Sequence, residues 1–173
     1  MGLWDTLPDQ REVHVWFVEL AASAASSEAC RRSLSADESE RASRFRSEHL
    51  ATAFTLSRGI LRVLLGRYLA VEPDCIRLAH GSRGKPRLSF PETPLEFNLA
   101  HSGRLTTYAF AVGCELGVDI EEVRPIRDQE AIVRRMFSRE ECEEWLGLDL
   151  SQRDAGFSGL QIALTGRGCR TKI

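Results

Sequence analysis

Two carboxylates separated by a single residue are the first candidates for chemistry in this sequence. Asp119 and Glu121 flank Ile120 in the stretch GVDIEEVRPI, which spans residues 117–126. On a β-strand, residues two apart face the same way, so both carboxylates would project together while Val118 and Ile120 point into the core. Such a pair is most often a solvated strand edge, but it also suits a hard cation such as Mg²⁺ that shares its ligands with a phosphate. The spacing alone leaves both interpretations open.

A second group of polar residues suits phosphate binding. His101 and Ser102 follow a short apolar strand in FNLAHSG, and Lys85 lies in the glycine-containing loop SRGKP. A lone histidine is more often a structural hydrogen-bonding residue. A hydroxyl, a flexible glycine backbone and a lysine ammonium in its company favour an anionic ligand. We expect both carboxylates to face the same cavity as His101 and Lys85.

The arginines are unevenly distributed along the chain. Arg41 stands near the end of an expected short helix, and Arg58 and Arg62 lie one turn apart in LSRGILRVLLGRYL. Most runs of charge are solvated faces. Arg58 and Arg62, however, stand close to an apolar seam, where a charge costs free energy unless it is paired or bound to an anion. An anionic ligand is therefore the alternative interpretation.

The secondary structure that must position these residues mixes helices and strands. Ser35 and Glu38 form a capping box that predicts a helix beginning at Ala36. Apolar residues at three-to-four spacing predict a long amphipathic helix from Ser47 to Leu69. The alternation of helices and strands predicts an α/β or α+β class. We further expect strands at 13–20, 97–103, 105–112 and 116–121, a loop at 80–94, and helices at 128–136 and 139–147.

Composition bounds the class of protein. The 173 residues are 43% hydrophobic and 28% charged, as in an ordinary globular protein, and no apolar run approaches the roughly 20 residues that span a bilayer. The N-terminus has no signal-peptide pattern, so we expect a cytoplasmic protein without membrane partners. Five cysteines without a CxxC motif are expected to be free thiols. A net charge of −2 argues against nucleic acid as a partner.

Taken together and in order, several segments resemble one family of enzymes. RASRFR, SRGILRVLLGRYL, GKPRL, FNLAHSG, GVDIEEVRPI and RRMFSREECEEW are similar to 4′-phosphopantetheinyl transferases of the Sfp type, in the holo-carrier-protein synthase superfamily. The resemblance extends from about Val13 to about Trp145. It implies a pair of α/β lobes related by a pseudo-two-fold axis, with a coenzyme A-binding lobe at 1–104 and an incomplete second lobe at 105–173.

The resemblance also implies a reaction and its residues. The family transfers 4′-phosphopantetheine from coenzyme A to a serine of an acyl or peptidyl carrier protein, with Mg²⁺ as cofactor. Asp119 and Glu121 match the carboxylates that hold this metal against the coenzyme pyrophosphate. The positions that match coenzyme contacts are Arg41 and Arg58 at the 3′-phosphate end, Lys85 and His101 at other phosphates, and Ser102 as an added hydrogen bond.

The sequence departs from the family after Phe157. Relatives continue with F-x-x-x-W-[ST]-x-K-E, whose glutamate and lysine act in the reaction, whereas this chain reads GFSGLQIALTGRGCRTKI up to Ile173. No tryptophan and no Lys-Glu pair occurs in that stretch, so no catalytic residue is assigned. The expectations are a truncated or altered transferase, or a noncatalytic module that binds coenzyme A or a carrier protein. A nucleic-acid binder using an Arg41–Arg67 face lacks the stacking aromatics that such a surface needs.

Overall fold

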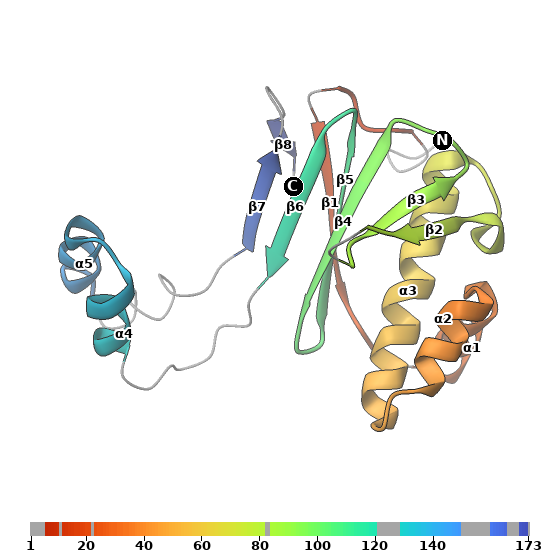
Figure 1. The fold of residues 1–173 in the computed structure, drawn as a ribbon, viewed down its shortest axis with the longest axis horizontal. Coiled ribbons are helices and arrows are strands. Elements are labelled where there is room, and N and C mark those ends of the chain that lie inside the picture. Colours follow the sequence, from red (N-terminus) through yellow and green to blue (C-terminus); the bar gives the residue numbers. More distant parts are fainter. Residues whose placement is uncertain are drawn as a thin grey trace.

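The chain forms a mixed α/β fold in which three helices lie on one side of a β-sheet (Figure 1): α1 (Ala24–Ser33), α2 (Ala36–Ser43) and α3 (Glu48–Leu69). The structure is a computed structural model that describes residues 6–10, 12–21, 23–81, 84–120, 129–149, 160–165 and 170–172. This confirms the class expected from the alternation of helices and strands.

The sheet is built mainly from antiparallel strands. In the part of the chain that the structure describes, its order is β4-β5-β1-β8, and only β8 runs parallel to its neighbour β1. Gly103, with a φ of 58°, begins the two-residue turn between β4 and β5, a geometry that glycine adopts without strain. The bounds are β1 Glu12–Glu19, β4 Leu95–Ser102, β5 Leu105–Val112 and β8 Arg170–Lys172.

The hairpin of β4 and β5 crosses the boundary expected between residues 104 and 105. Both strands belong to one sheet, and β5 also pairs with β1. Residues 105–112 thus pack with the first part of the chain. The division into two lobes between residues 104 and 105 stays a prediction.

The principal core lies between α3 and the sheet. Leu61, Leu65 and Tyr68 of α3 are buried against Tyr108 and Phe110 of β5. These helical residues recur every three or four positions, which gives the amphipathic face expected from the sequence. The helices are α1 Ala24–Ser33, α2 Ala36–Ser43 and α3 Glu48–Leu69. The start of α2 at Ala36 and the span of α3 are confirmed, whereas α1 was not expected.

The prediction of a loop over residues 80–94 is wrong in part. Strand β3, Pro86–Phe90, pairs antiparallel with β2, Arg77–His80, and the two follow the short 3₁₀ helix η1, Pro73–Cys75. Glycine and proline punctuate the segment, which favoured a loop. Proline is nevertheless tolerated at the first residue of an edge strand, where Pro86 stands.

A second apolar cluster lies on the other face of the sheet. Val13, Ala109 and Ala111 pack there with Leu116 and Val118 of β6. Strand β6, Glu115–Ile120, pairs antiparallel with β7, Leu160–Thr165. The two lie on the side of the sheet away from α3 (Figure 1).

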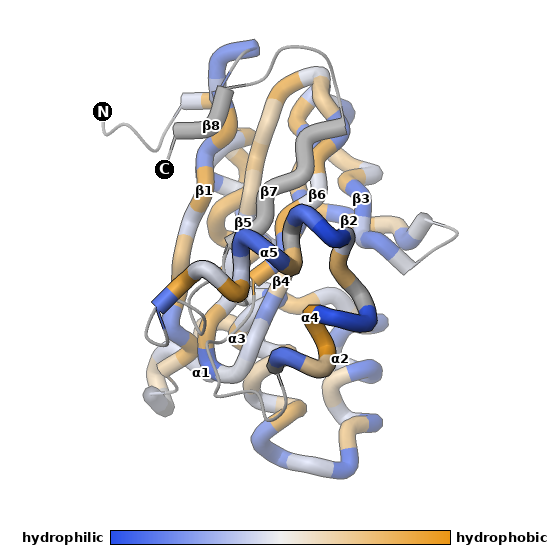
Figure 2. Tube along the Cα trace, turned by 90° about the vertical axis from the view of Figure 1, so that its left-hand side faces the viewer, coloured by the Kyte–Doolittle hydropathy of each residue, from blue (hydrophilic) through white to orange (hydrophobic). Residues whose placement is uncertain are grey.

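Helices α4, Gln129–Met136, and α5, Arg139–Leu146, follow β6 and agree with the spans expected from the sequence. Both lie well apart from α1, α2 and α3 (Figure 1). Hydrophobic residues concentrate along the strands of the sheet, while hydrophilic residues are prominent on α5 (Figure 2). Among the helices of the described residues, none combines the length and apolar character needed to cross a membrane.

Candidate functional site

An open cleft of about 440 Å³ lies where α2 and the first half of α3 face the hairpin of β4 and β5. Arg41 of α2, Arg58 of α3 and His101 of β4 line it. All three are residues that the sequence proposed for binding a phosphorylated ligand. The remaining lining residues are Leu20, Phe45, His49, Leu50, Ala53, Phe54, Ser57, Pro86, Leu99, Gly103 and Thr106.

Arg58 is the most unusual side chain of the cleft. Its exposed fraction is 8%, and its Nη1 is buried without a hydrogen-bond partner among the described residues. Burial lowers the pKa of the guanidinium, and the nearby carboxylate of Glu38 opposes that shift. A buried guanidinium nitrogen that the protein leaves unpaired is costly, so an anionic ligand at this point would relieve an unfavourable desolvation.

Phe54 stands between the two arginines of the cleft. The guanidinium carbon of Arg41 lies 5.3 Å from the Phe54 ring centroid, and that of Arg58 lies 5.7 Å from it. Phe45 packs on the same ring with a centroid separation of 5.5 Å. Because a ring face attracts cations, Phe54 stabilises both guanidinium groups at their positions in the cleft.

The local sequence explains why these side chains meet. Arg58 follows Phe54 by four residues on α3, so the two side chains lie on one helical face. Helix α2 begins with the reciprocal capping box expected from the sequence: Glu38 N donates to Ser35 Oγ, and Ser35 N donates to Glu38 Oε2. The last turn of this helix carries Arg41.

His101 and Ser102 are adjacent on β4 and therefore face opposite sides of the sheet. His101 is exposed and lies on the α3 side, together with Leu99 and Phe97. Ser102 is half-buried and lies on the opposite side, as Ala100 does, so the structure does not bring its hydroxyl into the cleft. The proposed role of Ser102 at phosphate remains a prediction.

Lys85 contacts β6 rather than the cleft. Its Nζ donates to the carbonyl oxygen of Leu116 at 2.8 Å and lies 3.7 Å from the Glu115 carboxylate. Arg87 donates to the same carboxylate at 3.1 Å. These contacts connect the hairpin of β2 and β3 to β6. Pro86, the residue that follows Lys85, does line the cleft, so Lys85 is next in sequence to the border of the cleft.

The carboxylate of Asp119 projects from β6 into solvent. Leu116, Val118 and Ile120 are buried while Asp119 is exposed, which is the strand alternation expected from the sequence. The Ile120 N–H donates to Asp119 Oδ1 at 3.0 Å. Asp119 does not line the cleft that contains His101.

The second carboxylate of the proposed metal site, Glu121, lies outside the described residues. Within those residues, no three His, Cys, Asp or Glu side chains gather closely enough to hold a metal ion. An exposed aspartate at the end of a strand is a suitable oxygen ligand for a hard cation such as Mg²⁺. Ligation by Asp119 and Glu121 remains a prediction.

Sequence reasoning did not identify the partner of Arg62. This side chain is 1% exposed, and its Nε donates to Glu38 Oε2 at 2.7 Å. The charge is therefore paired within the protein, and Arg62 does not extend a basic surface. Glu38 and Arg62 are 24 positions apart, so no local pattern could have revealed the pair.

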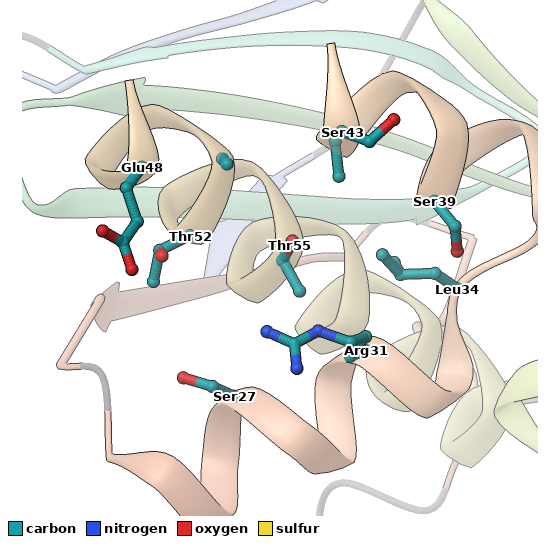
Figure 3. Close-up of a pocket in the computed structure, with 10 residues that line it drawn as sticks. Ser27, Arg31, Leu34, Ser39, Ser43, Glu48, Thr52 and Thr55 are labelled. Carbon is teal, nitrogen blue, oxygen red and sulfur yellow. The ribbon is translucent and has the colours of Figure 1, made fainter. Parts of the chain in front are cut away.

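A separate groove of about 290 Å³ lies between α1, α2 and α3. Figure 3 shows Ser27 and Arg31 from α1 facing Thr52 and Thr55 from α3 across it. Arg31 is exposed and paired with Glu28 at 3.2 Å. None of the residues proposed from the sequence lines this groove, which distinguishes it from the candidate site.

Comparison with known proteins identifies the family of the chain. Residues 21–112 match the family model described as the N-terminal part of 4′-phosphopantetheinyl transferase. The protein therefore belongs to the 4′-phosphopantetheinyl transferase family.

Individual relatives support the same assignment. The 4′-phosphopantetheinyl transferase HetI of Nostoc sp. is 40% identical over 134 residues, which cover 76% of this chain and 56% of the relative. A putative 4′-phosphopantetheinyl transferase of Synechocystis sp. is 30% identical over 142 residues, covering 78% and 58%. The 4′-phosphopantetheinyl transferase AcpT of Salmonella typhi is 39% identical over 83 residues, covering 48% and 41%. The chain thus spans less than two thirds of the length of these relatives.

Proposed function

We propose that the cleft binds coenzyme A, with Arg41 and Arg58 at its 3′-phosphate, and that this binding serves the transfer of 4′-phosphopantetheine to a carrier-protein serine. The observation that supports it most directly is the buried Nη1 of Arg58, which has no hydrogen-bond partner in the described part of the chain and lies in a cleft that also holds Arg41 and His101. Guanidinium groups bind phosphate through charge-assisted hydrogen bonds. From the family to which the chain belongs, we infer that the phosphorylated ligand is coenzyme A.

In the proposed reaction the serine oxygen of an acyl or peptidyl carrier protein attacks the phosphorus that bears pantetheine. A new serine O–P bond forms, the P–O bond to 3′,5′-ADP breaks, and the serine proton passes to solvent or to a base. Arg41 and Arg58 would bind the 3′-phosphate end, and His101, which lines the same cleft, would contact a further phosphate. Lys85 does not line the cleft and donates to the carbonyl oxygen of Leu116, so its contact with a phosphate would require this hydrogen bond to break. Mg²⁺ held by Asp119 and Glu121 would supply charge neutralisation on the pyrophosphate.

A noncatalytic coenzyme-binding module is a second candidate, since the sequence after Phe157 contains no Lys-Glu pair to match that of the family.

Nucleic-acid binding along an Arg41–Arg67 face has less support. Arg62 is buried in an ion pair, and Arg58 is buried in the cleft, so these side chains form no exposed basic stripe. We place the activity in the cytoplasm, where free thiols such as the described Cys30, Cys75 and Cys142 persist.

The proposed function is tested by calorimetric titration with coenzyme A and with dephospho-coenzyme A, which lacks the 3′-phosphate. We expect the protein to bind coenzyme A more tightly than dephospho-coenzyme A. Arg58→Gln should remove most of that preference, about tenfold, because one charge-assisted contact to phosphate is lost. Arg67→Gln is the matched control, since Arg67 is an exposed arginine of the same helix outside the cleft. Equal affinity of the unmodified protein for both ligands would contradict the proposal.

A further inference from the structure

The buried ion pair between Glu38 and Arg62 lies one helical turn from each arginine of the cleft, on α2 and on α3. We propose that this pair positions Arg41 and Arg58 for phosphate and thereby sets the preference of the cleft for the 3′-phosphorylated coenzyme. The inference rests on the proposed function. It adds two positioning residues that do not touch the ligand, since neither Glu38 nor Arg62 lines the cleft.

The contacts of the pair connect several elements. Arg62 Nε donates to Glu38 Oε2 at 2.7 Å, and the same carboxylate oxygen accepts from Ser35 N at 3.1 Å. Arg62 Nη1 donates to the carbonyl oxygens of Pro73 and Ile76, at 3.0 and 2.8 Å. One guanidinium therefore joins α3 to the N-terminus of α2 and to the segment that leads into β2.

The helical spacing transmits this geometry to the cleft. Arg41 follows Glu38 by three residues on α2, and Arg58 precedes Arg62 by four residues on α3. Residues at these separations lie on the same face of a helix, one turn apart. Fixing Glu38 against Arg62 therefore fixes the rotation of α2 relative to α3, and with it the distance between Arg41 and Arg58.

The pair also acts on the cleft through charge. Burial is the main cause that lowers the pKa of Arg58, and the neighbouring cations Arg41 and Arg62 lower it further. The Glu38 carboxylate is the opposing charge that favours protonated Arg58. Without the Glu38 carboxylate, the mutual repulsion of Arg41, Arg58 and Arg62 would no longer be offset. The buried Arg58 would then move toward solvent.

Glu38→Gln tests the proposal, because the amide keeps an oxygen that can accept from Ser35 and Arg62 but carries no charge. We expect the ratio of affinities for coenzyme A and dephospho-coenzyme A to fall about tenfold, as for the loss of one charge-assisted contact. A general loss of packing would lower both affinities together and leave the ratio unchanged. Glu40→Gln is the matched control on α2, since Glu40 forms an exposed ion pair with Arg44.

Arg62→Lys is the second variant. Lysine keeps a positive charge beside Glu38 but cannot also donate the two hydrogen bonds that Arg62 makes to the carbonyl oxygens of Pro73 and Ile76. Its thermal unfolding is measured first, and its ligand ratio is then measured below the onset of unfolding. We expect an intermediate fall in the ratio. A folded Glu38→Gln or Arg62→Lys protein with the ratio of the unmodified chain would overturn this inference and leave the proposed function standing. An unmodified chain without any preference for coenzyme A would overturn both.

Discussion

At the scale of single residues, the cleft depends on side chains that the sequence did not single out. Arg41, Arg58 and His101 were proposed from their sequence surroundings and from the resemblance to a family, and they do line one cleft. Phe54, whose ring is near the guanidinium groups of both arginines, carries no motif of its own and resembles any apolar residue of an amphipathic helix. The contact of its ring with Arg41 on α2 joins two separate helices. The periodicity of apolar residues within one helix cannot predict such a contact.

Replacing Phe54 by leucine should weaken the binding of coenzyme A about fivefold to tenfold. Leucine fills the helix face but has no ring quadrupole, so both cation–π contacts are lost, each worth about 0.5–1 kcal/mol at partly exposed sites. Calorimetric titration measures the effect. Phe90→Leu is the matched control, because Phe90 contacts Arg77 at 5.9 Å away from the cleft. Equal losses in the two variants would show that the Phe54 ring has no specific role.

At the scale of elements, Gly59 accounts for how closely α1 and α3 approach each other. A glycine in the middle of a helix normally weakens it by about 1 kcal/mol relative to alanine. Here a Cβ at residue 59 would lie 2.4 Å from Cys30 Cβ and 2.6 Å from Cys30 Cα. The close packing of the two helices requires the missing side chain.

Gly59→Ala should therefore destabilise the protein by about 1–3 kcal/mol, the usual effect of overpacking, despite the better helix propensity of alanine. Urea-induced unfolding followed by circular dichroism measures the change. Cys30→Ala in addition should not restore stability, because the collision involves the Cβ and backbone of residue 30 rather than its sulfur alone. A Gly59→Ala protein more stable than the unmodified one would show that α1 can move away at little cost.

The elements that sequence predicted well are those with a local physical signal. The Ser35 and Glu38 capping box, the apolar seam of α3 and the alternation in β6 each depend on neighbours within a few residues. Helix α1 was missed because its alanines and serines give little apolar periodicity, and its cap pairs Ser23 with Ser26 rather than with a glutamate. Strand β3 was missed because glycine and proline also mark hairpins at a sheet edge.

At the scale of the whole molecule, the cleft proposed for binding coenzyme A and the aspartate proposed for holding the metal lie on different sides of the sheet. The cleft with Arg41, Arg58 and His101 lies on the α3 side of the sheet, while β6 with Asp119 lies on the other. Ligand binding by the first group needs no part of the second. Transfer needs both, because charge neutralisation at the pyrophosphate and activation of the carrier serine must coincide with a bound coenzyme.

We therefore expect this 173-residue polypeptide to bind coenzyme A but to transfer phosphopantetheine much more slowly than a full-length relative. The reason is chemical: the sequence after Phe157 offers no counterpart of the family's tryptophan and Lys-Glu pair. Loss of one preorganised group of this kind commonly lowers a rate by a factor of about 10² to 10³, and groups that act as a unit do not add simply. The assay incubates the protein with coenzyme A, Mg²⁺ and an apo carrier protein, and follows the mass of the carrier.

The comparison that decides this prediction uses two proteins and two readouts. Nostoc HetI serves as the positive control for transfer, and coenzyme A titration shows that the tested chain is folded and competent to bind. A chain that binds coenzyme A and leaves the carrier mass unchanged separates the two functions as argued. Conversion of the carrier at a rate comparable to that of HetI would contradict the prediction and would mean that other residues of this chain perform the work of the missing motif. In that case Asp119→Asn should abolish the mass gain while leaving coenzyme A affinity in the absence of metal unchanged, because Asp119 lies outside the cleft.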